Sequence, residues 1–106
     1  MDKAIPFMDQ VVNTIVSTVN PEKIILFGSY ARGDYEKDSD IDLLVLKKGL
    51  KNEREVANNL YLKFFNQKIS VPIDIIAVDY DKYYQLNDDV GYIYKTIKRE
   101  GKVVYE

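Results

Sequence analysis

Apolar and polar residues alternate along this chain in segments whose spacing predicts the secondary structure. Apolar residues recur at helical intervals over 7–19, and Asn20-Pro21 ends the pattern, so we expect an amphipathic helix there. Three continuous apolar runs predict strands at 23–27 (KIILF), 41–46 (IDLLVL) and 72–78 (PIDIIAV). The first two have the pattern of strands buried on both faces, which places them inside a sheet.

The remaining apolar positions add helices to these strands. Their spacing predicts a second helix between about 52 and 67 and a last helix around 90–97, which Gly101 ends. Residues 103–105 form a short strand or a tail, and the acidic, aromatic segment 80–89 has no assignment. The order helix, strand, strand, helix, strand, helix predicts an α/β or α+β domain with helices against one central sheet.

Length and composition restrict the kinds of chemistry that are available. A chain of 106 residues has the usual size of one domain, so we expect residues 1–106 to form a single domain. The sequence contains no cysteine and no histidine, which removes disulfides, thiolate metal sites, most zinc sites and His-dependent nucleophilic catalysis. Carboxylate, hydroxyl, lysine and arginine chemistry remains, and it suits a hard cation such as Mg²⁺.

Charge and hydropathy indicate the setting in which the protein works. The formal net charge of -2 gives no general attraction to a polyphosphate backbone, which disfavours a nucleic-acid partner. The first ten residues, MDKAIPFMDQ, lack the pattern of a signal peptide, and no apolar run approaches membrane-spanning length. We therefore expect a cytoplasmic protein that does not bind membranes.

The segment 28–42 contains the candidate chemistry. Gly28 lets the backbone approach a bulky anion, and Ser29, if it opens a short helix, offers a hydroxyl and N–H groups to phosphate. Asp40 and Asp42 alternate along a strand, so their carboxylates point to the same face. Their mutual repulsion is relieved by protonation or by bound cations, for which two Mg²⁺ ions are the catalytic solution. A solvated acidic turn is the alternative at this point.

The spacing of these parts resembles a known signature. The pattern is similar to that of the nucleotidyltransferase superfamily typified by DNA polymerase beta. It consists of Gly28-Ser29, ten intervening residues, and then Asp40-Ile41-Asp42 before an apolar strand. Together with Ala31-Arg32-Gly33, they look closest to the minimal nucleotidyltransferases, the antitoxin partners of HEPN-domain toxins. The resemblance implies a nucleotidyltransferase fold with a mixed central sheet flanked by helices.

The resemblance also implies roles for individual residues. Gly28 and Ser29 would bind the β- and γ-phosphates of ATP, while Asp40 and Asp42 would hold two Mg²⁺ ions. The family requires a third carboxylate on a neighbouring strand, and Asp74 is the candidate inside an apolar run. It would bind the catalytic metal and help to deprotonate the attacking hydroxyl. Arg32 either neutralises the triphosphate or pairs with Asp34 or Glu36.

The function implied by the resemblance is transfer of AMP from ATP to a protein, with a tyrosine of a HEPN ribonuclease toxin as the acceptor, so that the chain acts as an antitoxin. One alternative is a nucleotidyltransferase for small molecules of the aminoglycoside kind, working as a homodimer. Another is a binding module that masks a HEPN partner without catalysis. The sequence leaves the nucleotide preference and the choice between homo- and hetero-oligomer open.

Overall fold

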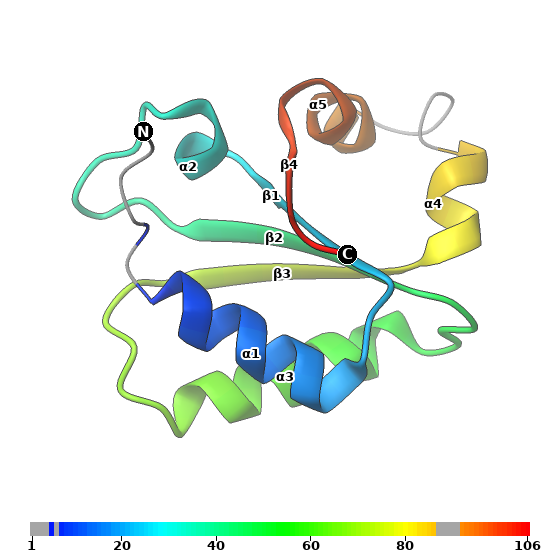
Figure 1. The fold of residues 1–106 in the computed structure, drawn as a ribbon, viewed down its shortest axis with the longest axis horizontal. Helices are drawn as coiled ribbons and strands as arrows, with labels where there is room; N and C mark the ends of the chain where they lie inside the picture. The colour runs from blue at the N-terminus through cyan, green and yellow to red at the C-terminus, as the bar shows by residue number, and fades with distance from the viewer. Residues whose placement is uncertain (1–4, 6, 87–91) are drawn as a thin grey trace.

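A four-stranded sheet forms the centre of the computed structural model, which describes residues 5, 7–86 and 92–106 (Figure 1). The strands are β1 (Lys23–Phe27), β2 (Ile41–Lys47), β3 (Ile73–Asp79) and β4 (Lys102–Tyr105), in the spatial order β3-β2-β1-β4. β1 is antiparallel to β2 and β4, while β2 and β3 are parallel. The sheet is therefore mixed, and the expected α+β fold is confirmed.

Helices cover both faces of this sheet (Figure 1). α1 (Met8–Val19) and α3 (Glu53–Phe65) pack on one face, and α4 (Tyr80–Leu86) and α5 (Tyr92–Glu100) lie on the other. The short α2 (Ser29–Arg32) follows β1 directly. Two apolar clusters result, one on each side of the sheet, which is the layered arrangement that buries both faces.

Side-chain alternation along β2 decides which face carries which chemistry. Ile41, Leu43 and Val45 belong to the cluster beneath α1 and α3, and all three are fully buried. Leu44 and Leu46 belong to the cluster beneath α4 and α5. Asp42 shares the parity of Leu44 and Leu46, so its carboxylate lies on the α4 and α5 face of the sheet.

Most predicted boundaries agree with the structure to within one or two residues. The segment 80–89, which had no assignment, begins with α4, and the rest of it lies outside the described residues, as does Val90 of the predicted last helix. Asp79, the last residue of β3, caps the start of α4, since its Oδ2 accepts the N–H of Lys82 at 3.0 Å. That bond, with help from the N–H groups of Leu50 and Gly49, lowers the pKa of Asp79. Residues 103–105 belong to edge strand β4.

Within the ranges that the structure describes, no helix combines the length and apolarity needed to cross a membrane.

Candidate active site

Gly28, at the end of β1, adopts a backbone conformation that essentially only glycine tolerates. Its φ of 76° and ψ of -158° lie in a region closed to residues with a Cβ. A Cβ at this position would also collide with Oδ2 of Asp42. The glycine therefore allows the turn after β1 and the Asp42 carboxylate to occupy neighbouring space.

Ser29 opens α2, as expected, and the turn that contains it is well anchored. The carbonyl of Gly28 accepts the N–H groups of Ala31 and Arg32, each at 3.0 Å. Tyr30 and Ala31 are buried in the cluster under α1 and α3, so they fix the short helix to the core. The N–H groups of Ala31 and Arg32 are thus used within the turn, and those of Ser29 and Tyr30, which come first in the helix, follow Gly28 directly.

Asp42 and Asp74 come together because β2 and β3 are parallel and in register. Asp42 pairs with Asp74 across these two strands, and with Phe27 of β1 on its other side. Residues paired in this way point to the same face of a sheet. Asp40 immediately precedes β2, two residues from Asp42. Asp40 and Asp74 are exposed, whereas Asp42 is half-buried between its neighbours.

The electrostatics of Asp42 reflect this crowding. Burial, followed by the negative charges of Asp74 and then Asp40, raises its pKa to about 6, against the opposing effect of Arg32. These surroundings disfavour the carboxylate relative to the protonated carboxyl group, and a nearby positive charge opposes that effect. Arg32 lies close enough to supply part of that charge.

Asp42 and Asp74, which the sheet pairs, and Asp40 just before β2 offer oxygen ligands for a magnesium site that substrate would complete. Among the described residues, no group of three or more carboxylates forms a ready-made cage for a cation. Mg²⁺ in enzymes that act on nucleotides is usually held by one or two carboxylates together with substrate phosphates. The donors here are hard oxygens, and the negative charges of Asp74 and Asp40 beside Asp42 are of the kind that a bound cation offsets. The donor set therefore fits Mg²⁺.

Arg32 uses its guanidinium group within the protein. Its Nε donates to Asp34 Oδ2 at 3.1 Å, and its Nη1 donates to Glu100 Oε1 at 3.2 Å. The expected pairing with Asp34 is thus present, whereas the partner at the end of α5 was missed, because Glu100 lies 68 residues away in the sequence. Glu36, the other expected partner, uses its backbone N–H to bond Ser39 Oγ.

Tyr61 of α3 is a neighbour of the site that sequence reasoning did not find. Its hydroxyl lies 3.2 Å from Oδ1 of Asp74 and donates to it. Nothing in the spacing of Tyr61 and Asp74 indicates this contact, since it depends on how α3 crosses the edge of the sheet. The tyrosine is 37% exposed, so the contact forms at the rim of the fold.

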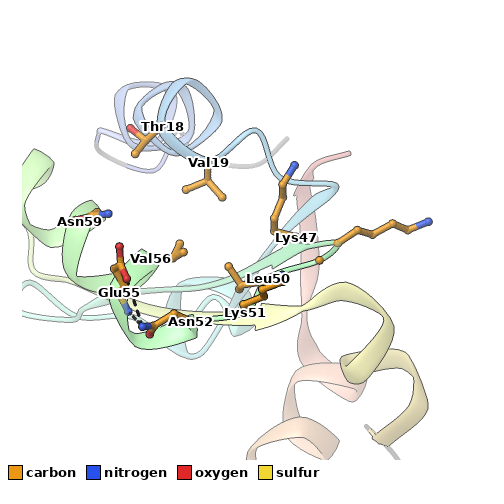
Figure 2. Close-up of a pocket in the computed structure, with 11 residues that line it drawn as sticks. Thr18, Val19, Lys47, Leu50, Lys51, Asn52, Glu55, Val56 and Asn59 are labelled. Atoms are coloured by element: carbon orange, nitrogen blue, oxygen red, sulfur yellow. Dashed lines mark hydrogen bonds between the residues drawn. The ribbon is translucent and has the colours of Figure 1, made fainter.

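A cavity of about 400 Å³ lies at the opposite end of β2 from the aspartates (Figure 2). Its polar groups mostly have partners in the protein. Lys47 Nζ donates to the carbonyl of Asn20 at 2.9 Å, and the ammonium of Lys48 lies 5.2 Å from the centre of the Tyr80 ring. The side chain of Asn52 accepts the N–H of Glu55 as the cap of α3. None of the residues that line the cavity is Asp40, Asp42 or Asp74, so the cavity lies apart from the candidate active site.

Sequence comparison finds a family model and two relatives that match this chain. A family model described as a nucleotidyltransferase domain matches residues 8–104. "Putative protein adenylyltransferase MJ0141" of Methanocaldococcus jannaschii is 49% identical over 43 residues, which are 38% of this chain and 43% of the relative. "Putative protein adenylyltransferase MJ0604" of the same organism is 72% identical over 25 residues, 24% of this chain and 25% of the relative. Both matches span less than half of the relative.

Solved structures share the fold over most of the chain. A protein of Sulfolobus solfataricus described as "a putative nucleotidyltransferase" has a TM-score of 0.60 and 24% identity, covering 92% of this chain and 75% of that one. A toxin-antitoxin with AMP-PNP has a TM-score of 0.57 and 20% identity, covering 92% and 73%. A mutant of the toxin-antitoxin MntA-HpeT has a TM-score of 0.63 and 18% identity, covering 92% and 70%. Because the family model covers nearly the whole sequence, the chain belongs to the nucleotidyltransferase domain family.

Proposed function

We propose that this protein is a Mg²⁺-dependent nucleotidyltransferase that moves AMP from ATP to a hydroxyl group of a protein, a tyrosine of a HEPN toxin, and so acts as an antitoxin. The observation that carries the proposal is the register of β2 and β3, which sets Asp42 beside Asp74 and next to Gly28. The names of the curated relatives support protein adenylylation. The solved toxin-antitoxin structures with this fold support a toxin partner.

The residues of the site divide the work. Gly28 and Ser29 bind the triphosphate, because the turn after β1 offers backbone N–H groups with no side chain at Gly28 to block the approach. Asp40, Asp42 and Asp74 would hold two Mg²⁺ ions, which when bound supply electrostatic stabilisation of the attacking and leaving oxygens. Phosphate oxygens of ATP would complete the coordination.

The chain's own groups handle the proton and the acceptor. In the transfer, a bond forms between the acceptor oxygen and the α-phosphorus, the bond to the β-phosphate oxygen breaks, and pyrophosphate leaves. Asp74 helps to take the proton from the acceptor hydroxyl. Arg32 steadies the phosphates after exchanging at least one of its carboxylate partners, Asp34 or Glu100, for ATP.

The position of Asp74 favours a protein as the acceptor. It lies on β3, the outermost strand on its side of the sheet, and it is exposed. A tyrosine on the surface of another protein can approach such a site without entering a closed pocket. We further propose that residues 1–106 act as one catalytic domain, and that the reaction takes place in the cytoplasm, where ATP is available.

Transfer of a label from ATP tests the proposal. The protein is incubated with Mg²⁺ and a candidate toxin, using ATP labelled at the α-phosphate in one reaction and at the γ-phosphate in the other. We expect only the α-label on the toxin, and none from the Asp40→Asn/Asp42→Asn double variant. Asp9→Asn on α1, on the other face of the sheet, is the matched control and should transfer normally.

The other outcomes identify the rival functions. Label on an aminoglycoside instead of the toxin would indicate a small-molecule nucleotidyltransferase. Neutralisation of the toxin by the double variant, without label on the toxin, would indicate masking by binding. Transfer of the γ-label would show phosphoryl transfer and would refute the proposal.

A further inference from the structure

Tyr61 contacts Asp74 although the two residues come from opposite faces of the sheet. It belongs to α3, which packs on the face opposite to Asp42 and Asp74, and its side chain extends to the outer edge of β3. There its hydroxyl accepts the N–H of Ile75 at 2.7 Å. The same oxygen lies 3.2 Å from Asp74 Oδ1 and 3.4 Å from the carbonyl of Ile75.

The single hydroxyl hydrogen of Tyr61 has two acceptors within reach, and the carboxylate is the better one. It is closer than the Ile75 carbonyl, and hydrogen bonds to an ionised acceptor are stronger than those between neutral groups. The N–H of Ile75 in turn fixes the oxygen of Tyr61 along the backbone of β3. Tyr61 thus links the edge strand to one oxygen of Asp74.

This link matters because Asp74 is otherwise an exposed side chain at the rim of the sheet. An exposed carboxylate samples several rotamers, and a cation bound by it must first select one of them. Carboxylates that hold metals are commonly fixed by a further hydrogen bond, and loss of that bond weakens metal binding or activity.

We propose that Tyr61 is a positioning residue for Asp74, an inference that rests on the proposed function. Its hydroxyl holds Oδ1 at the strand edge and leaves Oδ2 to face the cation and the acceptor. Tyr61 contacts neither ATP nor the acceptor in this account, so the nucleotide contacts made by Gly28 and Ser29 do not depend on it.

The test compares Tyr61→Phe with Tyr84→Phe. The control removes a hydroxyl from α4 that accepts a hydrogen bond from Lys23 at 2.8 Å, remote from Asp74. Binding of Mn²⁺, followed by the electron spin resonance signal of the free ion, should weaken roughly tenfold in Tyr61→Phe and stay unchanged in the control. In the transfer assay kcat should fall by about the same factor, while KM for ATP stays the same.

A double-mutant cycle separates positioning from a general structural effect. In the Asp74→Asn background, Tyr61→Phe should cause no further loss of Mn²⁺ affinity, because the group that it positions is already gone. A further loss as large as in the native background would overturn the proposal. So would equal Mn²⁺ binding by Tyr61→Phe and Tyr84→Phe.

Two more results bear on the role of Tyr61. If intact protein incubated with ATP and Mg²⁺ gained AMP on Tyr61, this residue would be an acceptor and the positioning role would be wrong. If the native protein transfers no AMP to any acceptor, the proposed function fails, and Mn²⁺ binding still tests the positioning role by itself.

Discussion

Replacing Asp42 by asparagine should stabilise the fold while abolishing AMP transfer. The asparagine side chain would have nearly the shape of the protonated carboxyl group but could never carry the charge that burial, Asp74 and Asp40 make unfavourable. Residues held in unfavourable surroundings for the sake of function commonly show this trade between stability and activity. The expected gain depends on pH, and both its sign and its size follow from the pKa of Asp42.

The folded protein holds the proton of Asp42 up to a pH of about 6, whereas the unfolded chain releases it near the ordinary value of 3.8. The folded state therefore binds more protons between these values, and stability falls as the pH rises through this window. The full difference corresponds to about 3 kcal/mol, since each unit of pKa is worth about 1.4 kcal/mol. Water still reaches the half-buried carboxylate, so we expect an effect of about 1 to 2 kcal/mol.

Urea unfolding without divalent cations measures this effect. At about pH 8 the Asp42→Asn variant should exceed the native protein by about 1 to 2 kcal/mol in free energy of unfolding, and near pH 4 the difference should disappear. Asp38→Asn, in the exposed loop before the strand, is the matched control and should show no comparable gain. If Asp42→Asn were no more stable than the native protein at pH 8, the ionised Asp42 carboxylate would not be destabilising. The same conclusion would follow if the gain in free energy of unfolding were equal at pH 8 and pH 4.

Further predictions concern the surroundings of Asp42. Gly28→Ala should lower the free energy of unfolding by about 1–3 kcal/mol because of backbone strain, and the collision of the new Cβ with Asp42 should lower it further. AMP transfer should also be lost. A variant as stable in urea as the native protein would contradict this. Leu43→Ala should cost about 2–5 kcal/mol, because this fully buried side chain fills the core beneath the site. Arg32→Ala should hardly change the melting temperature but raise KM for ATP roughly tenfold if the guanidinium binds phosphate. Saturating Mg²⁺ at about 100 times its Kd should stabilise the native protein by about 2.7 kcal/mol and leave Asp42→Asn almost unaffected, as thermal melts can show.

The arrangement of the sheet could be predicted from sequence where the hydrophobic pattern was strong. The runs in β1, β2 and β3 were found with boundary errors of at most one residue, because each strand contains a nearly unbroken apolar segment. Strand alternation also predicted that Asp40 and Asp42 share a face, and in the structure Asp40 lies just before the first residue of β2. The resemblance to the nucleotidyltransferase superfamily, to which the family model also assigns the chain, indicated that a third carboxylate is needed on a neighbouring strand.

The contacts that depend on tertiary packing could not be predicted. Asp74 was chosen for its place inside an apolar run, and no pattern in the sequence indicates that β2 and β3 align Asp42 with it. The pairing of Arg32 with Glu100 and the contact of Tyr61 with Asp74 link residues far apart in the chain. The helix α4 was missed because its start depends on Asp79, which also ended the strand. The roles of the site residues stay predictions.

Mass spectrometry of the acceptor shows whether this protein attaches AMP to a tyrosine of a toxin. The protein, a candidate toxin, ATP and Mg²⁺ are incubated, and the intact mass of the toxin and the modified residue are determined. With the native protein and with Asp9→Asn, we expect a tyrosine of the toxin to gain AMP as pyrophosphate is released. With Asp42→Asn, we expect no gain. An unchanged toxin mass with the native protein, or full modification by Asp42→Asn, would contradict it.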